Sequence, residues 1–210
     1  MFTGLVQAVG AVTGAAHQAG GVLRLTVDAR HWEHRARPGD SIAVDGCCLT
    51  VVGTSGEHDR TLDFDVVPQT LTVTTLASVQ PGQRVNLEHA ATPTTLLGGH
   101  IVQGHIDGVG IVEAVQRPDP GDGDYRLTIS VPTETEAFMM PRGSVCVSGV
   151  SLTLAEVRND GGLITVALIP TTLALTNLRD LSPGHGVNIE ADAMTKAVVA
   201  TVHRVMEQRR

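Results

Sequence analysis

The sequence predicts an all-β protein built from two tandem copies of one domain, followed by a single helix. Three observations support this prediction. Four blocks of sequence recur in the same order, 100 to 103 residues apart. Short runs of alternating apolar and polar residues, typical of half-buried strands, fill both copies. Helical spacing of apolar residues is confined to the C-terminal tail.

The repeated blocks are colinear. The most informative one, SIAVDGCCLT at Ser41–Thr50, returns as SVCVSGVSLT at Ser144–Thr153. The other three pairs are Met1–Gly10 with Ile101–Gly110, Pro68–Leu76 with Pro170–Leu178, and Pro81–Glu88 with Pro183–Glu190. Several ordered matches at a nearly fixed offset indicate a tandem duplication.

Strands are expected wherever apolar residues alternate with polar ones. The clearest runs are Leu23–Val27, Ser41–Val44, Leu62–Val66, Arg84–Glu88 and Tyr125–Val131. Turn pairs such as Asp45–Gly46 separate them, so each copy reads as a sandwich or a small barrel. Short helical turns are expected at 31–35 and 133–139, and an exposed turn at Pro118–Asp124.

We expect the two domains to meet near Leu96–Gly99, which gives a first domain over 1–97 and a second over 98–190. The tail, 191–210, carries apolar residues at the spacing of an amphipathic helix, with Asp192 at its start as an N-cap. A lone helix after two β domains needs a surface to pack against, and a partner subunit is the expected one.

Composition excludes several classes of protein. The net charge is −7 and the basic residues form no cluster, which argues against a nucleic-acid surface. Apolar runs are too short to span a membrane, and the N-terminus lacks the pattern of a signal peptide. Three cysteines, two of them adjacent, do not make a disulfide framework, so the cytoplasm is the expected compartment.

The two copies differ at positions that carry chemistry. Cys48 corresponds to Ser151, so only the first copy has a thiol able to add to an electrophilic carbon or donate a proton. The alternative is a small buried residue, as most free cysteines are. Cys47 and Cys146 are expected in the core.

His105 corresponds to Leu5 in the first copy, so the repeat itself does not require a histidine there. An imidazole suits proton abstraction, although a structural hydrogen bond is the alternative. His100 lies an odd number of residues away and is expected on the opposite face, as a boundary or inter-subunit residue. A shared metal is therefore not expected.

Asp192 corresponds to Ala90 and is either a site carboxylate, a helix N-cap, or both. Ser41 and Ser144 occupy matching positions, where a hydroxyl suits a ligand contact or a bond at the strand edge. Flat heterocycles are read by small hydroxyls and backbone groups, because buried charges cost solvation energy.

The motifs together resemble the riboflavin synthase family of the two-barrel, lumazine-binding type. They are MFTGLV, GDSIAVDGCCLTV, VVPQTL, VNLE, GGHIVQGHIDG, GVSLT, LIPTTL and VNIEAD, in the family's order and over essentially the whole chain. The resemblance implies two six-stranded antiparallel Greek-key barrels, each binding one 6,7-dimethyl-8-ribityllumazine. It further implies a homotrimer held by C-terminal helices, with active sites between the first barrel of one subunit and the second barrel of its neighbour.

The implied reaction transfers four carbons from one lumazine to another, giving riboflavin and 5-amino-6-ribitylamino-uracil without a metal or redox cofactor. Association with lumazine synthase is a further expectation. The implied catalytic residues are Cys48, His105, Asp192 and Ser41. The implied ligand contacts in the first half are Phe2, Gly4, Leu5, Val6, Leu49, Thr50, Asp65, Val66, Val67, Pro68, Gln69 and Thr70. Those in the second half are Gly104, Ile106, Arg142, Ser144, Ser151, Leu152, Thr153, Ala167, Leu168, Ile169, Pro170, Thr171 and Thr172.

Four positions depart from the family pattern. Arg142 stands in place of Lys, Gln69 of Glu, Ser148 of Asp or Asn, and His89 of Arg. These departures are either drift or the mark of a paralogous enzyme acting on a related lumazine or flavin. A non-catalytic binding protein for a related lumazine or flavin is a separate alternative.

Overall fold

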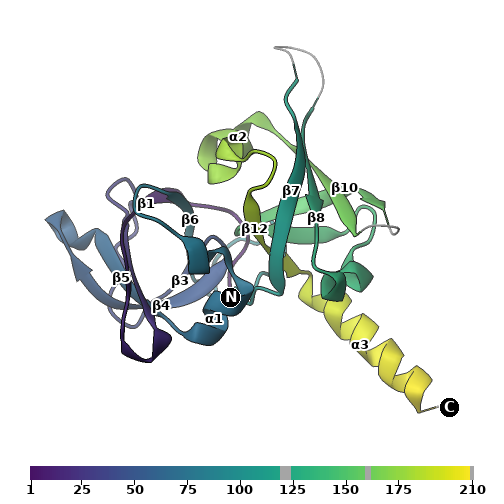
Figure 1. The fold of residues 1–210 in the computed structure, drawn as a ribbon, viewed down its shortest axis with the longest axis horizontal. Coiled ribbons are helices and arrows are strands. Elements are labelled where there is room, and N and C mark those ends of the chain that lie inside the picture. The colour runs from purple at the N-terminus through teal and green to yellow at the C-terminus, as the bar shows by residue number, and fades with distance from the viewer. Residues whose placement is uncertain (119–123, 159–161, 209–210) are drawn as a thin grey trace.

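The computed structural model describes residues 1–118, 124–158 and 162–208, and it places two β-barrels side by side (Figure 1). Six strands close each barrel. The first barrel contains β1 (Ala8–His17), β2 (Leu23–Asp28), β3 (Ser41–Val44), β4 (Cys47–Ser55), β5 (Thr61–Val66) and β6 (Arg84–His89). The second contains β7 (Gly108–Gln116), β8 (Tyr125–Ser130), β9 (Ser144–Val147), β10 (Val150–Arg158), β11 (Leu163–Leu168) and β12 (Gly186–Ala191).

Strand order confirms the duplication and the barrel fold. The first barrel runs β1-β2-β5-β4-β3-β6, and the second repeats this order with antiparallel pairing throughout. β-Bulges fall at matching places, after Val12 and Val112 and after Val51 and Leu154. A bulge bends a strand and increases its twist, which helps a small sheet to close.

Short helices connect the strands. Two α-helices, α1 (Pro68–Val73) and α2 (Pro170–Leu175), each begin with a proline, whose missing N–H is not needed in the first turn. The 3₁₀ turns are η1 (Ala19–Gly21), η2 (Glu57–Asp59), η3 (Thr75–Ser78), η4 (Thr133–Phe138) and η5 (Asn177–Asp180).

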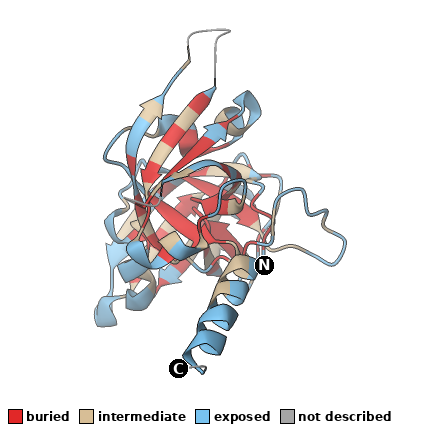
Figure 2. Cartoon of the chain, turned by 90° about the vertical axis from the view of Figure 1, so that its right-hand side faces the viewer, coloured by how far each residue is buried: buried red, intermediate tan, exposed pale blue. Residues whose placement is uncertain are grey.

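Every second side chain along the strands points inward, and these side chains fill each barrel. In β2, the side chains of Leu23, Leu25 and Val27 are buried while their neighbours are half-buried, as predicted. Buried segments gather inside both barrels in Figure 2. Aliphatic residues supply most of this core, together with a few aromatic side chains such as Phe64 and Trp32.

One predicted element is wrong. The turn expected at 133–139 is present as η4, but 31–35 forms no helix. Trp32 is buried in the first core, and its carbonyl accepts a hydrogen bond from the side chain of Arg60. That carbonyl is therefore held by a side chain from another part of the barrel. Most of the turn expected at Pro118–Asp124 lies outside the described residues.

A buried polar network joins the barrels. The side-chain amide of Asn86 donates to the carbonyl of Ser148 at 2.8 Å, and that of Asn188 donates to the carbonyl of Asp45 at 2.8 Å. Both asparagines are almost fully buried. The exchange is reciprocal, so an approximate two-fold axis relates the halves.

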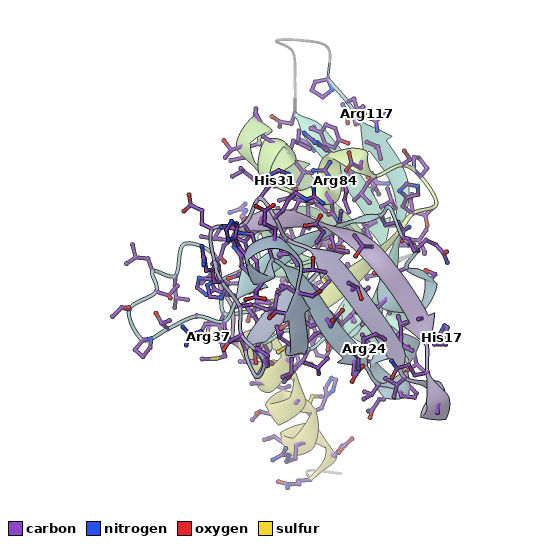
Figure 3. The ribbon with its side chains drawn as sticks, turned by 90° about the vertical axis from the view of Figure 1, so that its left-hand side faces the viewer. His17, Arg24, His31, Arg37, Arg84 and Arg117 are labelled. Atoms are coloured by element: carbon purple, nitrogen blue, oxygen red, sulfur yellow. The ribbon has the colours of Figure 1, made fainter. Side chains whose placement is uncertain are left out.

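Charged groups contribute less to this contact. Arg84 of the first barrel bonds Asp180 of the second at 2.9 Å, but both side chains are over a third exposed, so the pair adds little stability. Figure 3 views the molecule from the side of the first barrel and labels Arg84 together with His17, Arg24, His31, Arg37 and Arg117.

The last helix, α3 (Ala193–Glu207), leaves the second barrel and projects away from both barrels (Figures 1 and 2). Asp192 caps it as predicted, because its carboxylate accepts from the amides of Met194 and Thr195 at 2.8 and 3.0 Å. Met194, Val198, Val202, Val205 and Met206 are each more than 40% exposed. Within the described ranges, no helix has the length and apolar character needed to cross a membrane.

Candidate functional site

The opening segment of each half crosses to the other barrel. The amide of Cys48 in β4 donates to the carbonyl of Gly104 at 2.9 Å, and the amide of Ser151 in β10 donates to the carbonyl of Gly4 at 2.8 Å. The strands that carry Cys48 and Ser151 are therefore each covered by the opening segment of the other half.

The crossing segments also pair with each other. Phe2 and Val102 exchange two backbone hydrogen bonds, of 2.7 and 3.1 Å. Beyond this pair, Val6 packs against the second core and Ile106 against the first. The grouping expected from sequence is thus exchanged: Gly4–Val6 belong with the second barrel, and Gly104–Ile106 with the first.

Two buried carboxylates hold these segments. Glu88 accepts from the amides of Thr3 and Gly4 at 2.6 and 3.0 Å, and Glu190 accepts from the amides of Gln103 and Gly104 at 2.7 and 2.9 Å. Burial raises the pKa of both carboxyl groups, and these hydrogen bonds partly offset the rise. Each carboxylate therefore fixes backbone conformation close to a candidate site.

Cys48 lies on the outer face of the first barrel. Its neighbours Cys47 and Leu49 are buried, whereas Cys48 is half-buried and Thr50 is exposed. In the register of β3 with β4, Ser41 is opposite Thr50 and Ala43 is opposite Cys48. Successive side chains alternate between faces, so these four share one outer surface.

The three thiols differ in how deeply they are buried. Burial raises the pKa of Cys47 to about 12 and that of Cys146 well above its usual value. Both therefore remain protonated in the core, as expected from sequence. Because a thiolate is the reactive form and access is required, Cys48 is the one cysteine placed to act on a ligand.

His105 follows directly on the residue that covers Cys48. Its amide bonds Glu190 at 3.2 Å, and its side chain is exposed. A Cβ added to Gly104 would lie 2.5 Å from the Cβ of Cys48 and 2.9 Å from the ring of Phe2. Phe2 itself is only 1% exposed and packs between the barrels, in contact with Gly104.

The second barrel repeats this outer face with different residues. Ser144 pairs with Thr153, and Ser151 stands where the first barrel has Cys48. The hydroxyl of Ser151 lies 2.7 Å from Nδ1 of His100. His100 was expected as a boundary or inter-subunit residue. Its contact with Ser151 was missed because sequence spacing does not show that the segment crosses over β10.

The ends of β5 and β11 provide the other predicted contacts. Val66 and Leu168 are buried in the cores, as are Leu49 and Leu152, so only their backbone groups can reach a ligand. Asp65 is held by Arg24 through two hydrogen bonds, of 2.6 and 3.1 Å. The remaining predicted contacts that are exposed or half-buried are Leu5, Val67, Pro68, Gln69, Thr70, Ala167, Ile169, Pro170, Thr171 and Thr172.

Arg142 precedes β9 with a backbone φ of +66°, where the first half has Gly39 at +96°. A left-handed conformation is costly for a residue with a Cβ, and such strain is concentrated at functional sites. The side chain is exposed and bonds to no other described residue. Across the described residues, no three His, Cys, Asp or Glu side chains gather in a way that would hold a metal ion.

Comparison with known proteins places this geometry in a family. The model of the lumazine binding domain matches twice, at residues 3–90 and 103–192. Riboflavin synthase of Mycobacterium tuberculosis (strain ATCC 25618 / H37Rv) is 41% identical over 94% of this chain and 96% of that protein. Riboflavin synthase of Chlamydia muridarum is 37% identical over the whole chain and 98% of that protein.

The chain belongs to the riboflavin synthase family. Solved structures agree with this assignment. LumP complexed with riboflavin has a TM-score of 0.77 and 27% identity, over 91% of this chain and 99% of that one. LumP complexed with 6,7-dimethyl-8-(1'-D-ribityl) lumazine has a TM-score of 0.76 and 26% identity, with the same coverage. LumP therefore shares the two-barrel architecture of this chain.

Proposed function

We propose that the protein is a riboflavin synthase. Two molecules of 6,7-dimethyl-8-ribityllumazine react, one gives four carbons to the other, and riboflavin and 5-amino-6-ribitylamino-uracil result. One observation supports this reaction most directly. The chain presents two faces of the same construction, and only one carries a reactive thiol. A dismutation of identical molecules needs two similar pockets with different chemical groups.

In this proposal each candidate residue has a different chemical role. Cys48 adds to, or donates a proton to, an electrophilic ring carbon of the lumazine in the first site. His105, on the segment covering β4, takes a proton from the acidic methyl group of a lumazine. Ser41 and Thr50 bond the ring from the same outer face. Asp192 contributes a carboxylate at the end of β12, in addition to capping α3.

Some of the ligand-contact residues in both halves are exposed, and a second subunit would cover them. Val67 and Ile169 occupy matching positions and are 50% and 63% exposed. We assign the two ligand-binding units to 1–97 and 98–190, and trimerisation to 191–210. The active site then forms between the first barrel of one subunit and the second barrel of its neighbour.

Two further expectations follow from the proposed activity. An enzyme of riboflavin synthesis would work in the cytoplasm and would associate with lumazine synthase, which supplies its substrate. Co-sedimentation of the two purified enzymes tests the association, and unchanged sedimentation of both would exclude it.

The test of function is direct. The purified protein is incubated with 6,7-dimethyl-8-ribityllumazine, and both substrate and riboflavin are quantified. Two substrate molecules should disappear for each riboflavin formed. The likeness to LumP favours a second candidate, a non-catalytic binding protein for a lumazine or flavin. Tight binding without riboflavin formation would establish that candidate in place of the enzyme.

A further inference from the structure

We propose that the cavity between the two barrels is a further binding site, which takes a small organic cation whose ammonium or amidinium group bonds the carboxylate of Asp45. The cavity has a volume of about 540 Å³. None of the residues that line it belongs to the ligand contacts assigned to the two lumazine sites. The inference therefore goes beyond the proposed function and does not depend on it.

Matching parts of the two halves meet at this cavity. η3 and the start of β6 line it from the first half, and η5 and the start of β12 line it from the second. Asp45 and Ser148, in the turns before β4 and β10, also line it. These turns are in contact, because a Cβ added to Gly149 would lie 2.8 Å from the backbone nitrogen of Gly46. Polar groups of both halves thus converge on one space.

The duplication shows that the charge of Asp45 is not needed to hold its turn. Oδ1 of Asp45 accepts from the amide of Asn86 at 2.8 Å, and Oγ of Ser148 accepts from the amide of Asn188 at 3.3 Å. The two side chains therefore make the same structural contact, one in each half. A hydroxyl is sufficient for it, so the carboxylate in the first half has a capacity that the turn does not use.

The second oxygen of this carboxylate has no partner. Oδ1 accepts from the side chain of Asn177 as well, at 2.9 Å, whereas no described residue donates a hydrogen bond to Oδ2. Asp45 is only 9% exposed. A buried carboxylate without a counter-charge is costly, and a cation placed beside Oδ2 would remove that cost.

The other charged groups that line the cavity leave this position open. Arg84 bonds Asp180 at 2.9 Å, and the side chain of His185 is exposed. Burial raises the pKa of Asp45 to about 7, and none of the described cations opposes the rise. Because an adjacent positive charge favours the ionised carboxylate, a bound cation would displace the proton.

The remaining walls indicate the kind of cation. The hydroxyl-bearing residues Thr75 and Ser148 offer further acceptors, and Leu76, Val79 and Leu181 are apolar. The volume is far larger than a metal ion needs, and the described part of the chain gathers no three His, Cys, Asp or Glu side chains around a possible metal. A charged amine or amidine on a small apolar or flat body fits both the acceptors and the apolar walls.

The experiment compares benzamidine with benzamide, which has the same shape and no charge, by isothermal titration calorimetry of the full-length protein. At pH 8 we expect benzamidine to bind at least about tenfold more tightly, because its hydrogen bond to Asp45 is charge-assisted. At pH 6 its affinity should fall about tenfold, since a carboxyl with a pKa of about 7 must then lose its proton. Equal affinities for the two compounds, or no binding of benzamidine, would overturn the proposal.

Two variants assign the effect to Asp45. Asp45→Asn keeps the shape and the acceptor for Asn86, and it should lose both the preference for benzamidine and the pH dependence. Glu57→Gln, in η2, is the matched control, because that side chain is 91% exposed. Its titrations should match those of the unaltered protein. A preference for benzamidine that survives in Asp45→Asn would place the cation elsewhere.

Proton release provides a measurement that needs no variant, should Asp45→Asn fold poorly. Titrations at pH 6 in two buffers of different ionisation enthalpy should show close to one proton released for each benzamidine bound. Binding without proton release would reject the contact with Asp45.

A last titration separates this site from the lumazine sites. Benzamidine affinity should be unchanged in the presence of saturating 6,7-dimethyl-8-ribityllumazine, and competition between the two would contradict a separate site. Riboflavin formation is not part of the readout. A protein that forms no riboflavin would therefore refute the proposed function while leaving the benzamidine result intact.

Discussion

The backbone amide of Cys48 donates to the carbonyl of Gly104, 2.9 Å away, and this bond ties β4 of the first barrel to the opening segment of the second half. His105 is the next residue, so the segment that carries the histidine covers the strand that carries the thiol. The first site is therefore assembled from both halves of one chain before any partner subunit is added.

The roles assigned to the two faces can be separated by exchange of their side chains. Cys48→Ser should lower riboflavin formation by at least about tenfold, because a hydroxyl is a much weaker nucleophile than a thiol. Ser151→Cys should have a smaller effect, since Ser151 is proposed to bind and not to react. Steady-state kinetics measures both, and titration with the substrate checks that binding survives. Equal losses in the two variants would remove the division of roles.

Gly104→Ala tests the covering segment itself. The added methyl group would meet the Cβ of Cys48 at 2.5 Å, and the residue would have to keep a φ of +82°. We expect a lower thermal midpoint and little riboflavin formation. Gly184→Ala is the control, because its φ of +89° is similar but no heavy atom lies within 4 Å. That control should lose only the conformational term, about 1–2 kcal/mol. A matching loss in the two variants would show that the contact with Cys48 is unimportant.

Asp45 makes stability depend on pH. Burial raises the pKa of this carboxyl to about 7, against opposing hydrogen bonds from the amide of Asn86 and the side chain of Asn177. It lines a cavity of about 540 Å³ between the barrels. The folded protein therefore keeps a proton that the unfolded chain has already lost, so stability falls as pH rises from about 4 to about 7.

The expected size of this effect is on the order of 4 kcal/mol at most, at about 1.4 kcal/mol for each pKa unit. Thermal unfolding of the protein and of Asp45→Asn at pH 5 and pH 8 gives the comparison. Asparagine keeps an acceptor for Asn86 but does not titrate, so its midpoint should fall less between the two pH values. A midpoint that falls equally in both proteins would assign the pH dependence to other groups, such as Glu88 and Glu190.

Removal of α3 tests the assembly. Its exposed apolar residues, Met194 to Met206, have no other described surface to pack against. A chain that ends at Asp192 should show a lower oligomeric mass by light scattering than the intact protein. The proposed trimer would need another interface if the shortened chain kept the intact mass.

The fold was predictable from the sequence because the duplication and the strand alternation are local patterns. Leu23–Val27 and Arg84–Glu88 form strands where the alternation places them. The helical turn at 31–35 was wrong because a buried Trp32 and a distant Arg60 decide that conformation. Sequence spacing identified Cys48, and it could not show which half would cover it. The contact between His100 and Ser151 depends on the crossing of each opening segment to the other barrel, so no local sequence pattern predicts it.

The reciprocal crossing also bears on how the chain matures. During synthesis, β4 (Cys47–Ser55) is made before Gly104, so the face around Cys48 is still uncovered when β4 is complete. The bond from the amide of Cys48 forms only after Gly104, at the start of the second half, has been made, and the second half in turn uses the N-terminal residues to cover Ser151. Each barrel therefore depends on the opening segment of the other half, and a chain halted before Gly104 would leave the face around Cys48 without its cover.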